Sequence, residues 1–204
     1  KRERDRERER MASQSVLNIN VGVLGHVDSG KTTLARALSS VASTASFDKN
    51  PQSQERGITL DLGFSSFTVD TPDSLLRQMQ DSEEWMERRG LAERLQFTLV
   101  DCPGHASLIR AVIGGAQIID IIILVVDINK GIQTQTAECI VIGEMVAGDL
   151  VVALNKVDTI PEDKREATVA RVTDRLRKTF QTTRFGGDVP VVPISALGSI
   201  PSRE

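Results

Sequence analysis

Residues 25–32 read Gly-His-Val-Asp-Ser-Gly-Lys-Thr and match the pattern G-x-x-x-x-G-K-[ST], which is typical of phosphate-binding loops. A β-branched run at 18–24 precedes this loop, and apolar residues at helical spacing follow it over 32–41. Glycines let backbone N–H groups converge on a phosphate, and the helix N-terminus adds its positive dipole. We expect Lys31 to reach the β- and γ-phosphates of a nucleotide and the Thr32 hydroxyl to bind Mg²⁺. The nucleotide-binding residues predicted here are Asp28, Ser29, Gly30, Lys31, Thr32 and Thr33.

The rest of the chain alternates short apolar runs with helical stretches, which predicts an α/β domain. We expect a three-layer phosphate-loop domain with a mostly parallel, six-stranded sheet in which one strand, the second, is antiparallel. The predicted strands are 18–24, 59–69, 97–100, 121–126, 150–154 and 189–194, and the predicted helices are 32–41, 134–146 and 161–180. The polar stretch 43–57 predicts a loop, and the charged segment at about 71–95 predicts a partly helical surface insertion.

A second motif, Asn155-Lys156-Val157-Asp158, follows the strand predicted at 150–154. The Asp158 carboxylate can accept hydrogen bonds from N1–H and the N2 amino group of guanine, whereas adenine lacks both donors and would leave the carboxylate unpaired. Asn155 can serve the O6 and N7 side of the base and tie neighbouring loops together, and the stem of Lys156 can cover the base. Alone, this motif could be a short loop with a helix cap. After a phosphate loop it predicts a guanine-nucleotide site.

Two further motifs supply candidates for metal binding and catalysis. Asp101-Cys102-Pro103-Gly104-His105 begins at a strand end, where Asp101 can hold the Mg²⁺ shell and the Gly104 N–H can contact a γ-phosphate. His105 can orient an attacking water, or stabilise charge when protonated. Arg56-Gly57-Ile58-Thr59 ends the polar loop, and Thr59 is the second candidate Mg²⁺ ligand, ordered only with GTP bound. We therefore predict His105 as the catalytic residue and three metal ligands, namely Thr32, Thr59 and Asp101.

Composition excludes several other classes of protein. Of the 204 residues, 40% are hydrophobic and no apolar run approaches the roughly 20 residues of a membrane span. A net charge of −3 does not indicate the basic surface that nucleic-acid-binding proteins use. Cys102 and Cys139 are far apart in sequence, so we expect neither a disulfide framework nor a zinc site, and a reducing, cytoplasmic location. Residues 1–15 begin with ten charged residues and predict a disordered tail before a domain over 16–204.

Together these motifs resemble those of the translational GTPases, a family that includes elongation factor Tu and the γ subunit of initiation factor 2. The resemblance covers about residues 18–197. Within that family, two stretches closely resemble the eukaryotic and archaeal selenocysteine-specific elongation factors. They are residues 42–67 (ASTASFDKNPQSQERGITLDLGFSSF) and 101–120 (DCPGHASLIRAVIGGAQIID).

The resemblance implies an activity and roles for particular residues. It implies that in-line attack of water on the γ-phosphate of GTP times delivery of selenocysteyl-tRNA to the ribosome, and that hydrolysis is slow without the ribosome. By resemblance, Val27 and Ile58 form an apolar gate around His105, and Asp28 binds a monovalent cation. Residues 195–197 follow the last strand, where the family contacts guanine O6 through a backbone N–H. These residues are Ser195, Ala196 and Leu197.

Members of this family continue into a last helix of the GTP-binding domain, β-barrel domains that hold aminoacyl-tRNA, and a C-terminal domain. The sequence stops shortly after Ala196, so we expect a GTP-binding domain truncated before those parts, with tRNA contacts in the missing domains. The resemblance also implies a monomer that binds GTP or GDP and has no membrane partner.

Two alternatives stay open from the sequence. The chain could belong to another translation factor, similar to elongation factor Tu or initiation factor 2 γ, or to the GTPase subunit of a sulfate-activating enzyme. That last group usually carries Asp-Asp-Gly-Lys-Ser in its loop, which residues 28–32 do not match. The chain could also be a non-catalytic nucleotide-binding or interaction module.

Overall fold

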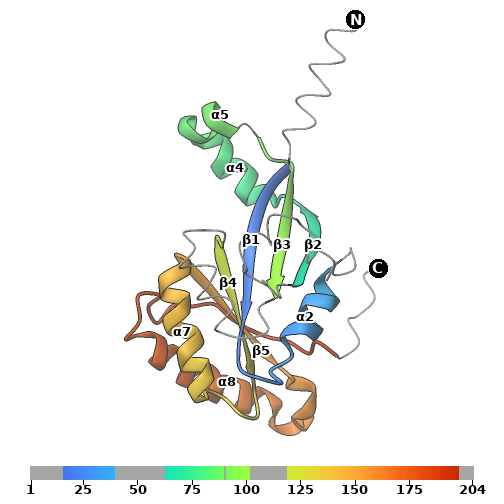
Figure 1. The fold of residues 1–204 in the computed structure, drawn as a ribbon, viewed down its shortest axis with the longest axis vertical. Coiled ribbons are helices and arrows are strands. Elements are labelled where there is room, and N and C mark those ends of the chain that lie inside the picture. The colour runs from blue at the N-terminus through green and yellow to red at the C-terminus, as the bar shows by residue number, and fades with distance from the viewer. Residues whose placement is uncertain (1–15, 40–62, 90, 102–118, 198–204) are drawn as a thin grey trace, which may run out of the picture.

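The computed structural model describes residues 16–39, 63–89, 91–101 and 119–197, with the backbone alone at 63–64, 87–89 and 101. These residues form one six-stranded sheet of order β2-β3-β1-β4-β5-β6, surrounded by helices (Figure 1). The strands are β1 (Val16–Leu24), β2 (Gly63–Asp70), β3 (Arg94–Asp101), β4 (Ile121–Asp127), β5 (Asp149–Asn155) and β6 (Val191–Pro193). The helices are α2 (Lys31–Leu38), α4 (Asp73–Asp81), α5 (Glu83–Arg89), α7 (Thr134–Val146), α8 (Glu162–Phe180) and the 3₁₀ turn η2 (Val157–Thr159).

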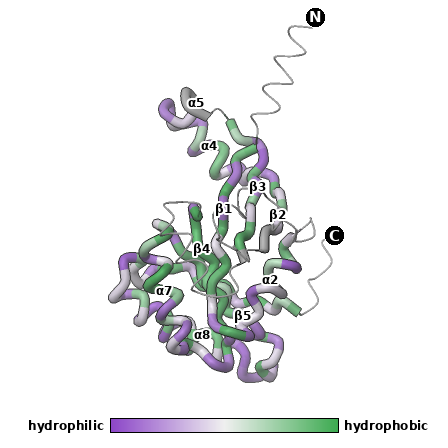
Figure 2. The backbone as a smooth tube through the Cα atoms, in the orientation of Figure 1, coloured by the Kyte–Doolittle hydropathy of each residue, from purple (hydrophilic) through white to green (hydrophobic). Residues whose placement is uncertain are grey.

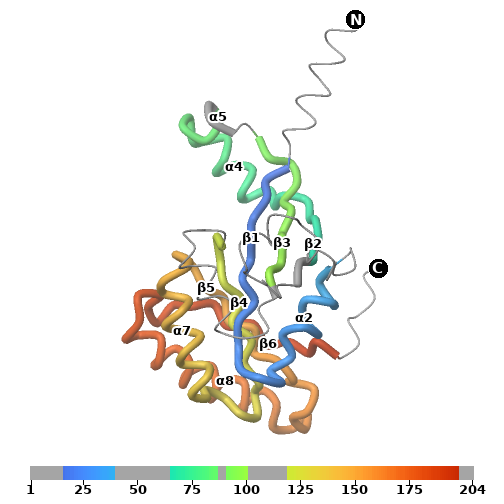
Figure 3. The backbone as a smooth tube through the Cα atoms, viewed as in Figure 1, coloured from blue at the N-terminus to red at the C-terminus, as the bar shows by residue number. Residues whose placement is uncertain are grey.

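The strand directions confirm the predicted fold class. Strands β3, β1, β4, β5 and β6 run parallel to their neighbours, and only β2 pairs antiparallel, with β3. Figure 3 shows the blue strand β1 between the green strand β3 and the yellow strand β4. The loop that follows β1 therefore leaves the middle of the sheet, at the carboxyl end where parallel α/β sheets bind ligands.

The central strands are apolar because both faces of the sheet are covered. Strand β4 reads Ile-Ile-Ile-Leu-Val-Val before its last residue, and Figure 2 shows hydrophobic colours along it. Leu124 and Val125 are both fully buried although successive side chains on a strand point to opposite faces. Leu124 packs in the core that contains Ile140 of α7 and Phe180 of α8. Val125 packs in a second core, with Leu34 of α2.

Some element boundaries differ from the predicted ones. Strand β3 begins at Arg94, before the predicted start at 97, because antiparallel pairing with β2 extends as far as Asp70 opposite Arg94. Strand β6 covers only 191–193 of the predicted 189–194. Helix α7 spans 134–146 as predicted, and α8 begins at Glu162 after Pro161. The loop predicted at 43–57 lies outside the described residues.

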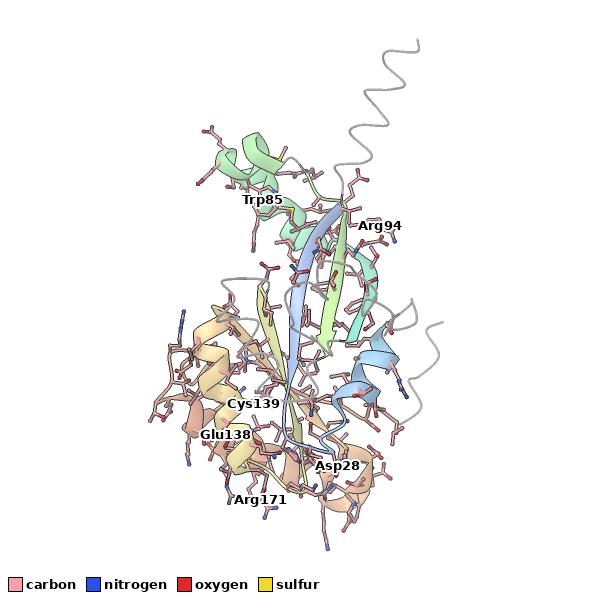
Figure 4. All side chains as sticks on the ribbon, viewed as in Figure 1. Asp28, Trp85, Arg94, Glu138, Cys139 and Arg171 are labelled. Atoms are coloured by element: carbon pink, nitrogen blue, oxygen red, sulfur yellow. The ribbon has the colours of Figure 1, made fainter. Side chains whose placement is uncertain are left out.

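The charged segment between β2 and β3 forms α4 and α5 at the end of the sheet opposite the phosphate loop (Figure 1). Thr71 closes the base of this segment: its N–H donates to the Glu93 carbonyl at 2.8 Å and its Oγ1 to the Ala92 carbonyl at 2.6 Å. Figure 4 shows the same separation, with Asp28 near one end of the sheet and Trp85 near the other. The two short helices are thus placed far from the motifs that predict nucleotide binding.

Candidate nucleotide-binding site

The loop between β1 and α2 takes its shape from residues with positive φ. The φ angles are 148° at Gly25, 63° at Asp28 and 97° at Gly30. A Cβ atom on Gly25 would lie 2.3 Å from the carbonyl oxygen of Val125, so a side chain there would collide with the backbone of β4. Asp28 holds its left-handed conformation without being glycine, a strained state that proteins keep mainly at functional sites.

Lys31 lies across this loop. Its Nζ donates hydrogen bonds to the carbonyl oxygens of Gly25 at 3.0 Å and His26 at 2.9 Å. A phosphate oxygen would be a stronger, charge-assisted partner for the ammonium group than a neutral carbonyl. Because α2 begins at Lys31, the backbone N–H groups of its first turn, which contains Thr32 and Thr33, point toward the N-terminal end of the helix, where the loop lies.

The strand register brings a predicted metal ligand to the same edge. Asp101 pairs with Val23 at the carboxyl end of β3, beside the strand that leads into the phosphate loop. Thr32 lies in the first turn of α2, at that edge. A hydroxyl and a carboxylate are the kind of oxygen ligands that Mg²⁺ prefers, so this pair of residues fits the ion. Three other predicted site residues lie outside the described part of the chain, namely Thr59, Gly104 and His105.

Asn155 joins the guanine motif to the phosphate loop. The residue is 2% exposed, and its Nδ2 donates to the Ser29 carbonyl at 2.9 Å. Its Oδ1 accepts the N–H of Lys156 at 2.8 Å and of Ala196 at 3.0 Å, so one amide holds three loops together. A Cβ on Gly30 would lie 2.3 Å from the same Nδ2, which explains why the second glycine of the loop is needed.

The two charged residues of the guanine motif lie in different surroundings. Lys156 has a φ of 67° and its Nζ donates to the Asp28 carbonyl at 2.7 Å, so its side chain crosses to the phosphate loop. Asp158 accepts a short hydrogen bond from the Ser195 hydroxyl. Leu197, two residues after Ser195, is 85% exposed. The structure therefore brings Asp158 and Ser195 together, beside the loop that carries Asn155 and Lys156.

One charged residue of this site, Asp127, lies outside the sequence motifs. Asp127 ends β4, is 3% exposed, and pairs with Lys156 at 2.8 Å. Burial by itself would raise the pKa of Asp127, but hydrogen bonds from Lys156 and Asn129, with the charge of Lys156, lower it below its ordinary value. The sequence signal that could have found it is an acid directly after six apolar residues of a buried strand.

His26 is the other buried polar residue of the loop. It is 4% exposed, and within the described residues neither ring nitrogen has a hydrogen-bond partner. Burial lowers the pKa of His26, and the charges of Lys130, Lys31 and Lys156 lower it further, against an opposing effect of Asp127. The imidazole is therefore neutral at pH 7.

Comparison with known proteins agrees with this site. Residues 17–201 match the family described as elongation factor Tu GTP binding domain. The chain is 56% identical over 186 residues to the selenocysteine-specific elongation factor of Mus musculus, covering 91% of the chain and 30% of that protein. It is 41% identical over 156 residues to the selenocysteine-specific elongation factor of Methanocaldococcus jannaschii, covering 76% and 28%. It is 31% identical over 187 residues to translation initiation factor 2 subunit gamma of Thermococcus onnurineus, covering 88% and 42%.

Solved structures give the same result. The apo form of translation elongation factor SelB from Methanococcus maripaludis matches with a TM-score of 0.57 and 30% identity, over 89% of this chain and 30% of that one. The complex of that factor with the GTP analogue GppNHp matches equally well. The chain thus spans about 30% of the length of the selenocysteine-specific relatives and 42% of the initiation factor subunit. No described helix is both long and apolar enough to cross a membrane.

The resemblance to selenocysteine-specific elongation factors is confirmed by these matches. The family match covers nearly the whole described chain, and the phosphate loop and the guanine motif follow β1 and β5, which lie on either side of β4 in the sheet. This chain belongs to the family of elongation factor Tu GTP-binding domains.

Proposed function

We propose that this domain binds GTP and GDP with Mg²⁺ and hydrolyses GTP. One observation carries the proposal: two side chains of the guanine motif donate hydrogen bonds to the phosphate loop. Asn155 Nδ2 lies 2.9 Å from the Ser29 carbonyl, and Lys156 Nζ lies 2.7 Å from the Asp28 carbonyl. A single ligand with guanine at one end and phosphates at the other would contact both loops at once.

Each part of the site would act on a different part of the nucleotide. Asp158 would accept the N1–H and N2 donors of guanine, and Lys31 would neutralise charge on the β- and γ-phosphates. Mg²⁺ held by Thr32, Thr59 and Asp101 would supply charge neutralisation between those phosphates. His105 would orient the water for in-line attack. A monovalent cation at Asp28 belongs to the same proposal, supported by the strained backbone there.

The binding proposal is tested by competition on this 204-residue chain. Fluorescent GDP is bound in the presence of Mg²⁺, and unlabelled GTP, GDP or ATP is added. We expect displacement by GTP and GDP but not by ATP, because adenine would leave the Asp158 carboxylate unpaired. Equal displacement by ATP would exclude a guanine-selective pocket. Asp158→Ala serves as the matched variant, in which discrimination against ATP should weaken.

We infer further that the whole factor delivers selenocysteyl-tRNA to the ribosome in the cytoplasm, acting as a monomer. The matches to two proteins named as selenocysteine-specific elongation factors support this assignment. The chain spans 30% of the mouse protein, and we propose that tRNA contacts belong to other parts of the factor. A tRNA pull-down with the full-length protein tests the inference. Enrichment of bulk elongator tRNAs without selenocysteine tRNA would contradict it and favour another translation factor.

Ribosome-stimulated hydrolysis is tested by His105→Ala in the full-length protein. Because His105 is assigned to water and not to the nucleotide, the variant should bind GTP nearly as the wild type does. Hydrolysis on the ribosome should fall by about 100-fold or more, the usual contribution of a positioned general base or water-orienting group. Equal turnover by the two proteins would remove His105 from the mechanism.

A further inference from the structure

Asp127 connects the loop after β4 with the guanine motif through a single carboxylate. Its Oδ2 lies 2.8 Å from Lys156 Nζ. Its Oδ1 accepts the backbone N–H of Asn129 at 2.9 Å and the Asn129 side-chain amide at 3.3 Å. Both oxygens thus have partners, which a charge buried to 3% exposure requires.

Lys156 is the partner whose position depends most on this carboxylate. Its side chain is 31% exposed, and lysine stems have many rotatable bonds. The ammonium group contacts Asp127 on one side and the Asp28 carbonyl on the other. The carbonyl is neutral and lies on the phosphate loop, whereas Asp127 is fixed at the end of a central strand. Asp127 is therefore the rigid, charged anchor of the pair.

We propose that Asp127 is a positioning residue for the guanine nucleotide: its buried carboxylate holds the Lys156 side chain across the phosphate loop, so that the lysine stem is in place to cover the base before the nucleotide arrives. This inference rests on the guanine-nucleotide site proposed above. A side chain ordered in advance loses no freedom on binding, and affinity gained in this way shows mainly as slower release.

A purely structural role for Asp127 has a different signature. Asn129 Nδ2 also donates to Thr159 Oγ1 at 2.8 Å, and Thr159 Oγ1 donates to the Lys156 carbonyl at 2.6 Å. Through this route Asp127 could simply hold the loop after β4 against the 3₁₀ turn. In that case removing Asp127 would weaken the fold whether or not the Lys156 side chain were present. Positioning through the lysine predicts that the effect disappears once that side chain is gone.

The experiment is a double-mutant cycle on the release of fluorescent GDP, measured by stopped flow with Mg²⁺ and excess unlabelled GDP. The proteins are wild type, Asp127→Ala, Asp127→Asn, Lys156→Ala and the double variant Asp127→Ala with Lys156→Ala. We expect Asp127→Ala to release GDP about tenfold faster. Asp127→Asn keeps a hydrogen-bond acceptor but loses the charge, so its rate of GDP release should lie between those of the wild type and Asp127→Ala. The double variant should match Lys156→Ala within about twofold.

Asp120→Asn is the matched control, because Asp120 lies just before the other end of β4 and its carboxylate accepts the Asn20 N–H at 2.7 Å. Its release rate should equal that of the wild type. Wild-type release by Asp127→Ala, or effects of Asp127 and Lys156 that simply multiply, would overturn the positioning role. If Asp127→Ala fails to fold, Asp127→Asn alone and with Lys156→Ala gives the same comparison. Failure of the wild type to bind GDP would instead overturn the proposed function.

Discussion

At the scale of single residues, His26 is the least satisfied group of the phosphate loop. Its ring is buried and, among the described residues, neither nitrogen has a partner, although its backbone carbonyl accepts Lys31 Nζ. Ser29 Oγ, in the same loop, is fully buried and also lacks a partner there. Buried polar atoms without partners lower stability, and native proteins keep them mostly where function requires a particular local geometry.

The neutral state of His26 predicts a pH dependence of stability. Its folded-state pKa lies below the ordinary value of 6.5, so the unfolded chain binds a proton more readily. Stability from the neutral ring is complete above pH 6.5 and is lost as the pH falls through the folded-state pKa. His26→Leu should flatten the fall in unfolding free energy between pH 7 and 5, and at pH 7 should match the wild type or gain about 1 kcal/mol. Urea titrations at several pH values measure both effects.

His105→Gln provides the comparison, since it removes the only other histidine of the chain. The slope of unfolding free energy against pH should differ from that of the wild type more in His26→Leu than in His105→Gln. An unchanged slope in His26→Leu would show that the buried imidazole has an ordinary pKa.

Residues of the site differ in how far sequence could predict them. Residues within motifs, such as Lys31 and Asn155, could be placed because each motif follows a strand and parallel strands end at one edge of the sheet. Asp127 was missed because its role depends on a contact with Lys156 that is 29 positions away in sequence and on another strand end. A charge after an apolar strand shows a special position but does not identify its partner.

At the scale of elements, α8 packs on the sheet through an apolar face that has two fully buried side chains. Leu176 and Phe180 are fully buried four residues apart, and the Phe180 ring meets the Phe185 ring edge to face at 6.4 Å. Val169 and Val172 pack against the same core while partly buried, and the rest of the helix is largely polar. The helix follows η2, which contains Val157 and Asp158 of the guanine motif.

This packing predicts that Leu176→Ala lowers the free energy of unfolding by about 2–5 kcal/mol, because it removes apolar contacts and leaves a cavity. Arg171→Ala, on an exposed position of the same helix, should change it by about 0.5 kcal/mol or less. Urea denaturation of the nucleotide-free proteins measures the difference. Similar stability of the two variants would mean that α8 contributes little to the core.

The boundaries of an element could be predicted from sequence where burial of apolar side chains determines them. They could not be predicted where backbone pairing between strands determines them. Helix α7 and strand β4 have apolar residues at nearly every inward position, so their limits follow from hydrophobicity. The early start of β3 depends on backbone pairing with β2, and among its first three residues Leu95 is the one apolar side chain, between Arg94 and Gln96. Strand β6 is short for a related reason: its hydrogen bonds go only to β5, at the edge of the sheet.

At the scale of the whole molecule, the sheet separates two regions. The phosphate loop and the guanine motif lie at the carboxyl ends of β1 and β5, whereas α4 and α5 lie at the far end of β1 and β3 (Figure 1). Thr71 closes the base of the α4–α5 segment through hydrogen bonds to Ala92 and Glu93. We propose that the segment is a surface insertion in a single GTP-binding domain.

This separation predicts that the segment can be removed without loss of nucleotide binding. Asp70 and Arg94 are directly paired partners of β2 and β3, so an Asn-Gly turn can join them as a two-residue hairpin in place of 71–93. Affinity for GDP should stay within about threefold. The free energy of unfolding should fall by about 1–3 kcal/mol, because Leu95, which is 5% exposed in the intact chain, would become more exposed to water.

Fluorescent GDP titration and urea denaturation measure these two effects separately, and Leu95→Ala in the intact chain calibrates the stability change. A folded hairpin variant that no longer bound GDP would show that α4 and α5 influence the site through the length of β1 and β3. Retained binding would instead make the far end of the sheet independent of the nucleotide. The exposed Met86 of α5 and the helices around it could then be altered freely to test what else this end of the domain contacts.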